Sequence, residues 1–144
     1  MQSVLRVTTH SEEETRAVAR TVAHLLKSGD CLVLSGQLGA GKTVFVRGLA
    51  EGLGIDPAKV HSPSFTILNE YRGEPSLYHF DLYRLSSLNE LTETGWDDYL
   101  SRDGVAVIEW GERAGSRLPD RYYQVTMISD DETSRGIEIT LVTA

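Results

Sequence analysis

The alternation of apolar and polar positions first predicts a helix near the start of the chain. Ser11 followed by Glu14 forms the pattern of a capping box, in which the serine caps the helix and the glutamate reaches back. We expect Gly29 to close this helix, because glycine tolerates the backbone conformation that ends one. Four apolar residues recur at the spacing of a buried helical face: Val18, Val22, Leu25 and Leu26.

Two further helices follow from the same spacing. One is expected to run from Lys42 to about Leu53 and to stop at Gly54. The other opens at Ser87 with a second capping box, completed by Glu90, and continues to about Leu100.

Short runs of apolar or alternating residues between these helices predict strands. The runs 31–35 and 105–108 are apolar throughout, which is typical of strands buried on both faces of a sheet. The expected strands cover residues 31–35, 65–71, 77–83, 105–108, 123–128 and 137–142. Because strands alternate with helices and there are 144 residues, we expect residues 1–144 to form a single α/β domain with a mixed, partly parallel central sheet.

Composition narrows the class of protein. The chain has 21 acidic and 14 basic residues, a net charge of −7, and no cluster of lysine or arginine. A protein that grips nucleic acid by itself usually carries a basic patch, so we expect any link to RNA to run through a protein partner. Neither a signal peptide nor a membrane-spanning run is evident, and the one cysteine, Cys31, is expected to be a buried structural thiol. These features predict a cytoplasmic protein without membrane association.

The clearest motif is a phosphate-binding loop between the strand at 31–35 and the helix that begins at Lys42. Residues 36–43 match the pattern GxxxxGK[ST] in full. Glycines let the loop curl so that its backbone N–H groups point at phosphate oxygens, and the helix N-terminus adds a positive dipole end. Lys42 then provides a charge for the β- and γ-phosphates, and the Thr43 hydroxyl is a ligand for Mg²⁺. The motif predicts a P-loop NTPase-like three-layer fold, with Leu38, Gly39, Ala40 and Gly41 forming the rest of the loop.

An acidic partner for the metal is expected at the end of a neighbouring strand. Glu109 ends the apolar strand 105–108 and is the best candidate, the alternative being a glutamate that points into solvent. Trp110 comes next; composition alone favours a core position over a lid above the site.

Two other segments leave alternatives open. His79, Asp81 and Tyr83 share one face of the expected strand, where they either orient a water or bind a metal, or form a solvated face. Residues 62–65, Ser-Pro-Ser-Phe, follow the second helix as switch I does in GTPases, and are either a γ-phosphate sensor or a simple turn.

Taken together, the loop Gly39 to Thr43, the segment 62–65, the run Tyr78 to Leu85 and Glu109-Trp110 resemble the bacterial TsaE family. The resemblance covers nearly the whole chain. That family is the ATPase component of the machinery that makes threonylcarbamoyladenosine at position 37 of tRNA. Two positions depart from the family pattern: Ser64 replaces a threonine, and Ala19 stands where many relatives have glycine.

The resemblance implies ATP and Mg²⁺ as cofactors. It implies that Thr43 and Glu109 hold Mg²⁺, that Asp81 positions water or the metal, and that Trp110 lies near the nucleotide. The segment containing Ser64 becomes a switch-like loop. Thr15 and Arg135 are candidate contacts on the adenine side.

The resemblance also implies a partner, the TsaD–TsaB complex, with tRNA reached only through that complex. A chain this short has little length left for a lid over the γ-phosphate, so we expect slow hydrolysis by the chain alone. The main alternative is a small-molecule or nucleoside kinase that uses the same loop. A GTPase switch is disfavoured because neither Asn-Lys-x-Asp nor Asp-x-x-Gly occurs in the sequence.

Overall fold

The computed structural model describes residues 2–37, 41–61 and 67–143 of the chain. In these residues the strands form one seven-stranded sheet in the order β1-β7-β6-β2-β5-β4-β3. The strands are β1 (Gln2–Thr9), β2 (Cys31–Gly36), β3 (Leu68–Tyr71), β4 (Leu77–Asp81), β5 (Val105–Glu109), β6 (Arg121–Ser129) and β7 (Arg135–Thr143). The helices are α1 (Glu12–Leu25), α2 (Lys42–Gly52), α3 (Leu88–Thr94) and α4 (Trp96–Ser101), with 3₁₀ turns η1 (Pro57–Lys59), η2 (Gly111–Arg113) and η3 (Gly115–Arg117).

The centre of the sheet is parallel and its two flanks are antiparallel. β2 pairs in parallel with both β5 and β6, and β4 pairs in parallel with β5. β7 joins β6 and β1 in antiparallel register, and β3 joins β4 in the same way. The predicted mixed, partly parallel sheet is therefore confirmed.

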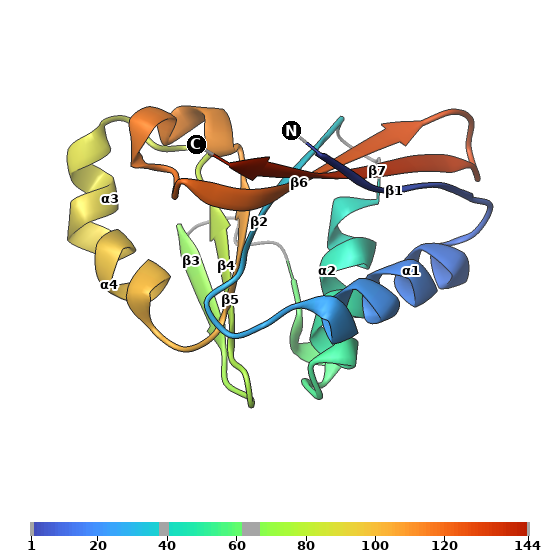
Figure 1. Cartoon of the computed structure of the whole chain (residues 1–144), viewed down its shortest axis with the longest axis horizontal. Helices are drawn as coiled ribbons and strands as arrows, with labels where there is room; N and C mark the ends of the chain where they lie inside the picture. Colours follow the sequence, from blue (N-terminus) through green and yellow to red (C-terminus); the bar gives the residue numbers. More distant parts are fainter. Residues whose placement is uncertain (1, 38–40, 62–66, 144) are drawn as a thin grey trace.

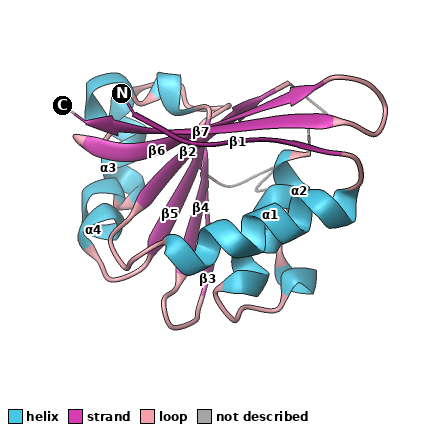
Figure 2. Ribbon diagram, turned by 45° about the vertical axis from the view of Figure 1, so that its right-hand side comes forward, coloured by secondary structure: helices cyan, strands magenta, loops and turns pink. Residues whose placement is uncertain are grey.

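Helices cover the two faces of the sheet and make three layers. Helices α1 and α2 lie on one side, and α3 and α4 lie on the other (Figures 1 and 2). Successive side chains of β2 point to opposite faces of the sheet. Leu32 and Leu34 belong to the apolar cluster that includes α1 and α2. Cys31 and Val33 belong to the cluster on the opposite face. A strand buried on both faces has to be apolar throughout, which explains the unbroken apolar run that the sequence shows there.

The strand β1 has no counterpart among the predicted elements. Its side chains are exposed or partly exposed except for Thr9, and it pairs only with β7 at the edge of the sheet. Because an edge strand buries so little, its sequence lacks the apolar signal by which the central strands were identified.

The first helix begins as predicted and ends earlier. The Ser11 side chain accepts a hydrogen bond from the Glu14 backbone N–H at 3.1 Å, whereas the Glu14 carboxylate accepts from the His10 N–H at 2.8 Å, not from Ser11. The helix stops at Leu25, and Gly29 lies in the following turn with φ of +97°. The prediction that Leu25 faces the core is wrong, since this residue is 69% exposed.

The stretch from Ser87 to Leu100 is two helices and not one. Gly95 adopts φ of +85° and separates α3 from α4, a left-handed conformation that glycine adopts without steric cost. The second capping box is half formed. Ser87 makes no side-chain cap, whereas the Glu90 carboxylate reaches back to the backbone N–H of Ser87 and also accepts from the N–H and hydroxyl of Ser86.

The strand predicted over 77–83 ends two residues early, at Asp81. There the Asp81 carboxylate accepts a hydrogen bond from the Tyr83 N–H at 3.0 Å, which turns the chain away from the sheet. The strand β3, predicted over residues 65–71, begins at Leu68 in the structure, and residues 65 and 66 lie outside the described residues.

No helix in the described ranges has both the length and the apolar character needed to cross a membrane.

Helices α1 and α2 pack at very close range through small residues. A Cβ added to Gly48 would lie 2.6 Å from both the Ala19 Cβ and the Arg16 carbonyl oxygen. A Cβ added to Gly52 would lie 2.6 Å from the Ala23 Cβ. Glycines spaced four apart on one helix therefore face alanines spaced four apart on the other, and neither glycine can gain a side chain without moving a helix.

We predict that Gly48→Ala destabilises the fold. Overpacking costs about 1–3 kcal/mol, and contact with a backbone carbonyl cannot be relieved by a rotamer change, so the cost should exceed the roughly 1 kcal/mol that alanine usually adds to a helix. Urea unfolding should show a lower midpoint for the variant. Adding Ala19→Gly should recover part of the loss, because it removes one of the two close contacts; a Gly48→Ala protein as stable as wild type would contradict the packing described.

Candidate functional site

The phosphate-loop motif leads from the central strand into a helix. β2 ends at Gly36 and α2 begins at Lys42, so the loop lies at the carboxyl end of a parallel strand. Gly41 adopts φ of +97°, a left-handed conformation that favours glycine, and α2 has no side-chain cap. Its first N–H groups are thus left to other acceptors, as in helices that bind phosphate. Leu38, Gly39 and Ala40 lie outside the described residues.

Parallel pairing brings two carboxylates to the same edge. In the register of the sheet, Leu34 of β2 pairs with Glu109 of β5, and Glu109 pairs with Asp81 of β4. Paired residues point to the same face, here the face that α2 covers. Ligands of open α/β sheets bind outside the carboxyl ends of such strands, which makes this edge the candidate site.

Glu109 is buried and held from two sides. Its side chain is only 9% exposed, so the alternative of a glutamate in solvent is wrong. Its Oε1 lies 3.6 Å from the Lys42 Nζ, and its Oε2 accepts a hydrogen bond from the His79 Nε2 at 2.6 Å. Burial alone would raise the pKa of Glu109, but the contacts with His79 and Lys42 outweigh it and hold the pKa below its usual value. The carboxylate is therefore ionised at neutral pH.

Asp81 differs from its neighbour in charge behaviour. Partial burial and then the negative charge of Glu109 raise the pKa of Asp81, although the hydrogen bond from the Tyr83 N–H opposes the shift. Because His79 is fully buried, the alternative that His79 and Asp81 form a solvated face is wrong for His79.

Trp110 is not a core residue, contrary to what composition favours. It is 36% exposed and adopts φ of +60°, a strained conformation for a bulky residue. The Lys42 Nζ lies 5.7 Å from its ring centroid, and the Tyr83 ring lies 5.0 Å away on the surface. The sharp turn after Glu109 thus brings an aromatic ring beside the lysine of the loop.

The donors at this edge suit a magnesium ion that also binds a nucleotide. Thr43 is the second residue of α2 and carries a hydroxyl oxygen, and Glu109 offers an ionised carboxylate oxygen. In the described part of the chain no group of three or more histidine, cysteine, aspartate or glutamate residues could hold a metal. Mg²⁺ is commonly bound by one or two protein oxygens together with phosphate oxygens, so the sparse donor set fits it.

The remaining candidate residues fall in three places. The Arg135 Nε lies 3.8 Å from where a Cβ of Gly41 would be, beside the phosphate loop. The hydroxyl of Thr15 is buried and lies 2.7 Å from that of Thr9, whose backbone pairs with Arg135. Ser64, with the rest of the segment 62–65, lies outside the described residues.

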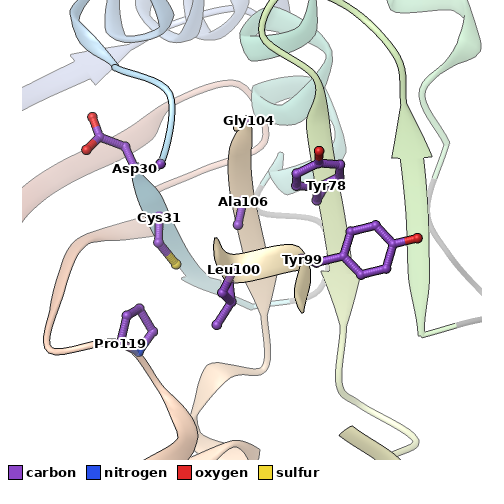
Figure 3. A pocket seen from close by; sticks show the side chains of 9 residues that line it. Asp30, Cys31, Tyr78, Tyr99, Leu100, Gly104, Ala106 and Pro119 are labelled. Carbon is purple, nitrogen blue, oxygen red and sulfur yellow. The ribbon is translucent and has the colours of Figure 1, made fainter. Parts of the chain in front are cut away.

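A small cavity lies away from this edge, near the amino ends of β2 and β5. It measures about 30 Å³, room for a single water, and its lining includes Cys31, Tyr78 and Ala106 (Figure 3). Burial, and then the charge of Asp30, raises the pKa of the Cys31 thiol to about 12. The prediction of a buried structural thiol is confirmed, and the cavity is too small to serve as a substrate pocket.

The sheet with helices on both faces forms a three-layer fold, and the phosphate-loop motif lies between its central strand β2 and α2. Together they define an α/β domain of the P-loop NTPase-like class. A model of the family "Threonylcarbamoyl adenosine biosynthesis protein TsaE" matches residues 9–137. The chain belongs to the TsaE family, as the sequence motifs had suggested.

Individual relatives support this assignment. The chain is 46% identical over 123 residues to the tRNA threonylcarbamoyladenosine biosynthesis protein TsaE of Treponema pallidum, covering 85% of this chain and 89% of the relative. It is 42% identical over 139 residues to the protein of the same name from Bacillus subtilis, covering 96% and 86%. The crystal structure of Bacillus subtilis YdiB superposes with a TM-score of 0.78 at 35% identity, covering 100% of this chain and 89% of that one. The comparisons favour a role in threonylcarbamoyladenosine biosynthesis over the small-molecule kinase alternative.

We predict that Glu109→Gln lowers the pKa of Asp81. The substitution removes a neighbouring negative charge, so Asp81 should ionise more easily, while its burial and the Tyr83 N–H bond stay in place. Carboxyl NMR titration of wild type and variant measures the shift. Asp131 is the internal control and should titrate alike in both proteins, because hydrogen bonds from Thr133 and Ser134 within the β6–β7 turn set its pKa. An unchanged or higher pKa for Asp81 would show that the two carboxylates do not interact.

Proposed function

We propose that this protein binds and hydrolyses ATP with Mg²⁺ as a subunit of the machinery that forms threonylcarbamoyladenosine at position 37 of tRNA. In this proposal it acts through the TsaD–TsaB complex and reaches tRNA only through that complex. A cytoplasmic location belongs to the same proposal. The observation that carries it is the 3.6 Å approach of the Lys42 Nζ to the Glu109 carboxylate, where the phosphate-loop motif meets the carboxyl ends of parallel strands.

Each residue of this edge has a role in the proposal. Lys42 contacts the β- and γ-phosphates, and the loop from Leu38 to Gly41 surrounds them with backbone N–H groups. Thr43 and Glu109 would hold Mg²⁺, which supplies charge stabilisation to the phosphoryl group. Asp81 either positions the attacking water or contacts the metal. Its raised pKa makes it the better proton acceptor of the two carboxylates, which favours the water-positioning role.

Four further residues complete the proposed nucleotide site. Trp110 lies near the nucleotide, a position supported by its ring lying 5.7 Å from the Lys42 Nζ. Arg135 contacts the adenine side, supported by its place beside Gly41. We also place Thr15 on the adenine side. Because its hydroxyl is buried against that of Thr9, Thr15 would affect nucleotide binding through Thr9 and β1. Ser64 would respond to the γ-phosphate.

The proposed need for a partner rests on surface and charge. The Trp110 and Tyr83 rings contact each other with their centroids 5.0 Å apart, and the two residues are 36% and 54% exposed. Aromatic side chains are enriched where proteins bind one another. The net charge of −7 disfavours direct binding to tRNA. A protein complex that covers the aromatic pair would bring the ATPase to tRNA and complete its site.

We predict that Lys42→Ala abolishes binding of ATP while the fold persists. The substitution removes the positive charge proposed to contact phosphate, and Lys42 begins a helix without being part of either hydrophobic cluster. Calorimetric titration with ATP and thermal unfolding measure the two properties. Lys59→Ala, which removes an exposed lysine in η1, is the matched control and should bind as wild type does. Affinity within a few-fold of wild type for Lys42→Ala would refute the phosphate-loop assignment.

We also predict that the chain alone hydrolyses ATP well below the range of about 1–10³ s⁻¹ typical of enzymes, and that the TsaD–TsaB pair changes this rate several-fold. Steady-state hydrolysis is measured for the chain alone, with free tRNA and with the pair. Free tRNA should have no effect, because the chain is acidic. Full activity of the chain alone that ignores the pair, or transfer of the γ-phosphate to a small hydroxyl compound, would overturn the proposal in favour of a stand-alone ATPase or a kinase.

A further inference from the structure

The proposed roles make no use of His79, although it is one of few buried polar side chains among the described residues. It lies in the middle of β4, and its partner in β5 is the apolar Val107. Val107 in turn pairs with Leu32 of β2, and both belong to the apolar cluster against α1 and α2, while the partner of His79 in β3 is the polar Asn69. An apolar side chain would fill this place without the cost of burying a polar ring, so the histidine calls for a specific reason.

The hydrogen bonds of the ring indicate that reason. The Nε2 atom donates to the Glu109 Oε2 at 2.6 Å, the short distance expected for a bond to a carboxylate. The other ring nitrogen, Nδ1, has no hydrogen-bond partner within the described ranges. Glu109 is therefore the partner around which the imidazole is oriented.

The two oxygens of Glu109 divide between two donors that differ in mobility. Oε1 faces the Lys42 Nζ at 3.6 Å, and Oε2 faces His79. Lysine is a flexible chain with a charge at its tip, whereas the His79 ring lies in a fully buried position on β4, between β5 and β3. If Lys42 leaves Glu109 to make the phosphate contacts proposed above, Oε1 loses its partner and only the bond to Oε2 remains.

We propose that His79 is the positioning residue of Glu109: it holds the carboxylate in one orientation after Lys42 has turned to the nucleotide, so that Oε1 faces the metal. This inference rests on the proposed function. A partner that fixes a metal-binding carboxylate typically changes metal affinity or activity by about 10–100-fold when removed. His79 acts through Glu109 and does not itself contact the nucleotide or the metal.

Two substitutions separate this role from simple filling of the core. His79→Gln keeps an N–H donor at the end of a side chain that reaches about as far as Nε2 of the imidazole. His79→Leu fills the space without a donor. Phe80→Leu is the control for core damage, because Phe80 is the next residue of β4, fully buried on the opposite face against Trp96.

The first measurement needs no nucleotide. In the Lys42→Ala background, the three-bond NMR couplings about χ1 and χ2 of Glu109 report whether the side chain occupies one rotamer or several. When position 79 is histidine or glutamine, we expect Glu109 to occupy a single rotamer. When position 79 is leucine, we expect Glu109 to average over several rotamers. A single rotamer in the Lys42→Ala/His79→Leu protein would overturn the proposal.

The second measurement follows ATP hydrolysis against Mg²⁺ concentration. We expect His79→Leu to lower kcat by about tenfold or more and to raise the Mg²⁺ concentration needed for half-maximal rate, with KM for ATP changed less than about threefold. His79→Gln should recover most of both losses, and Phe80→Leu should keep the Mg²⁺ response of wild type. Equal effects of His79→Leu and Phe80→Leu, or no recovery with Gln, would overturn the positioning role. If wild type shows no Mg²⁺-dependent hydrolysis, the proposed function fails, and the rotamer measurement alone decides whether His79 holds Glu109.

Discussion

The parallel pairing of β4, β5 and β2 is the constraint on which the candidate site depends. Because the three strands run in one direction, their carboxyl ends meet at one edge, and their register puts Asp81, Glu109 and Leu34 in a single row. The first two residues end their strands, and the third lies two residues before the phosphate-loop motif. The backbone pairing alone thus makes neighbours of residues that are far apart in the sequence. A shift of register by one residue would turn both carboxylates to the α3–α4 face.

Burial of charge at this edge has a cost that the surrounding structure offsets. A carboxylate as covered as Glu109 is tolerated because the Lys42 ammonium of α2 lies 3.6 Å from one oxygen and His79 of β4 donates a hydrogen bond to the other. Trp110 adds strain in the backbone directly after it. The stability needed to hold these features comes from the two apolar clusters on either side of the sheet, which share the central strands and so lock the row from both faces.

The sequence predicted most where burial was complete. β2 and β5 were found from apolar runs, and the strand-end position of Glu109 followed from the second of them. The phosphate-loop motif with Lys42 was found from its residue pattern. The edge strand β1 was missed because it buries little, and Leu25 was assigned inward because the end of α1 was misjudged. Trp110 was expected in the core because composition carries no information about a backbone turn with positive φ. His79 was left open because the pairing that brings it to Glu109 joins residues 30 apart, which periodicity along one strand cannot reveal.

The two tryptophans of the chain differ in their exposure to solvent. Trp96 is fully buried in the α3–α4 layer, where its ring contacts Phe80 and its Nε1 donates to the Arg117 carbonyl at 3.0 Å. Trp110 directly follows the last residue of β5, is 36% exposed, and has its ring centroid 5.7 Å from the Lys42 Nζ. The tryptophan fluorescence of the described residues therefore combines one fully buried ring with one partly exposed ring next to the lysine of the phosphate-loop motif.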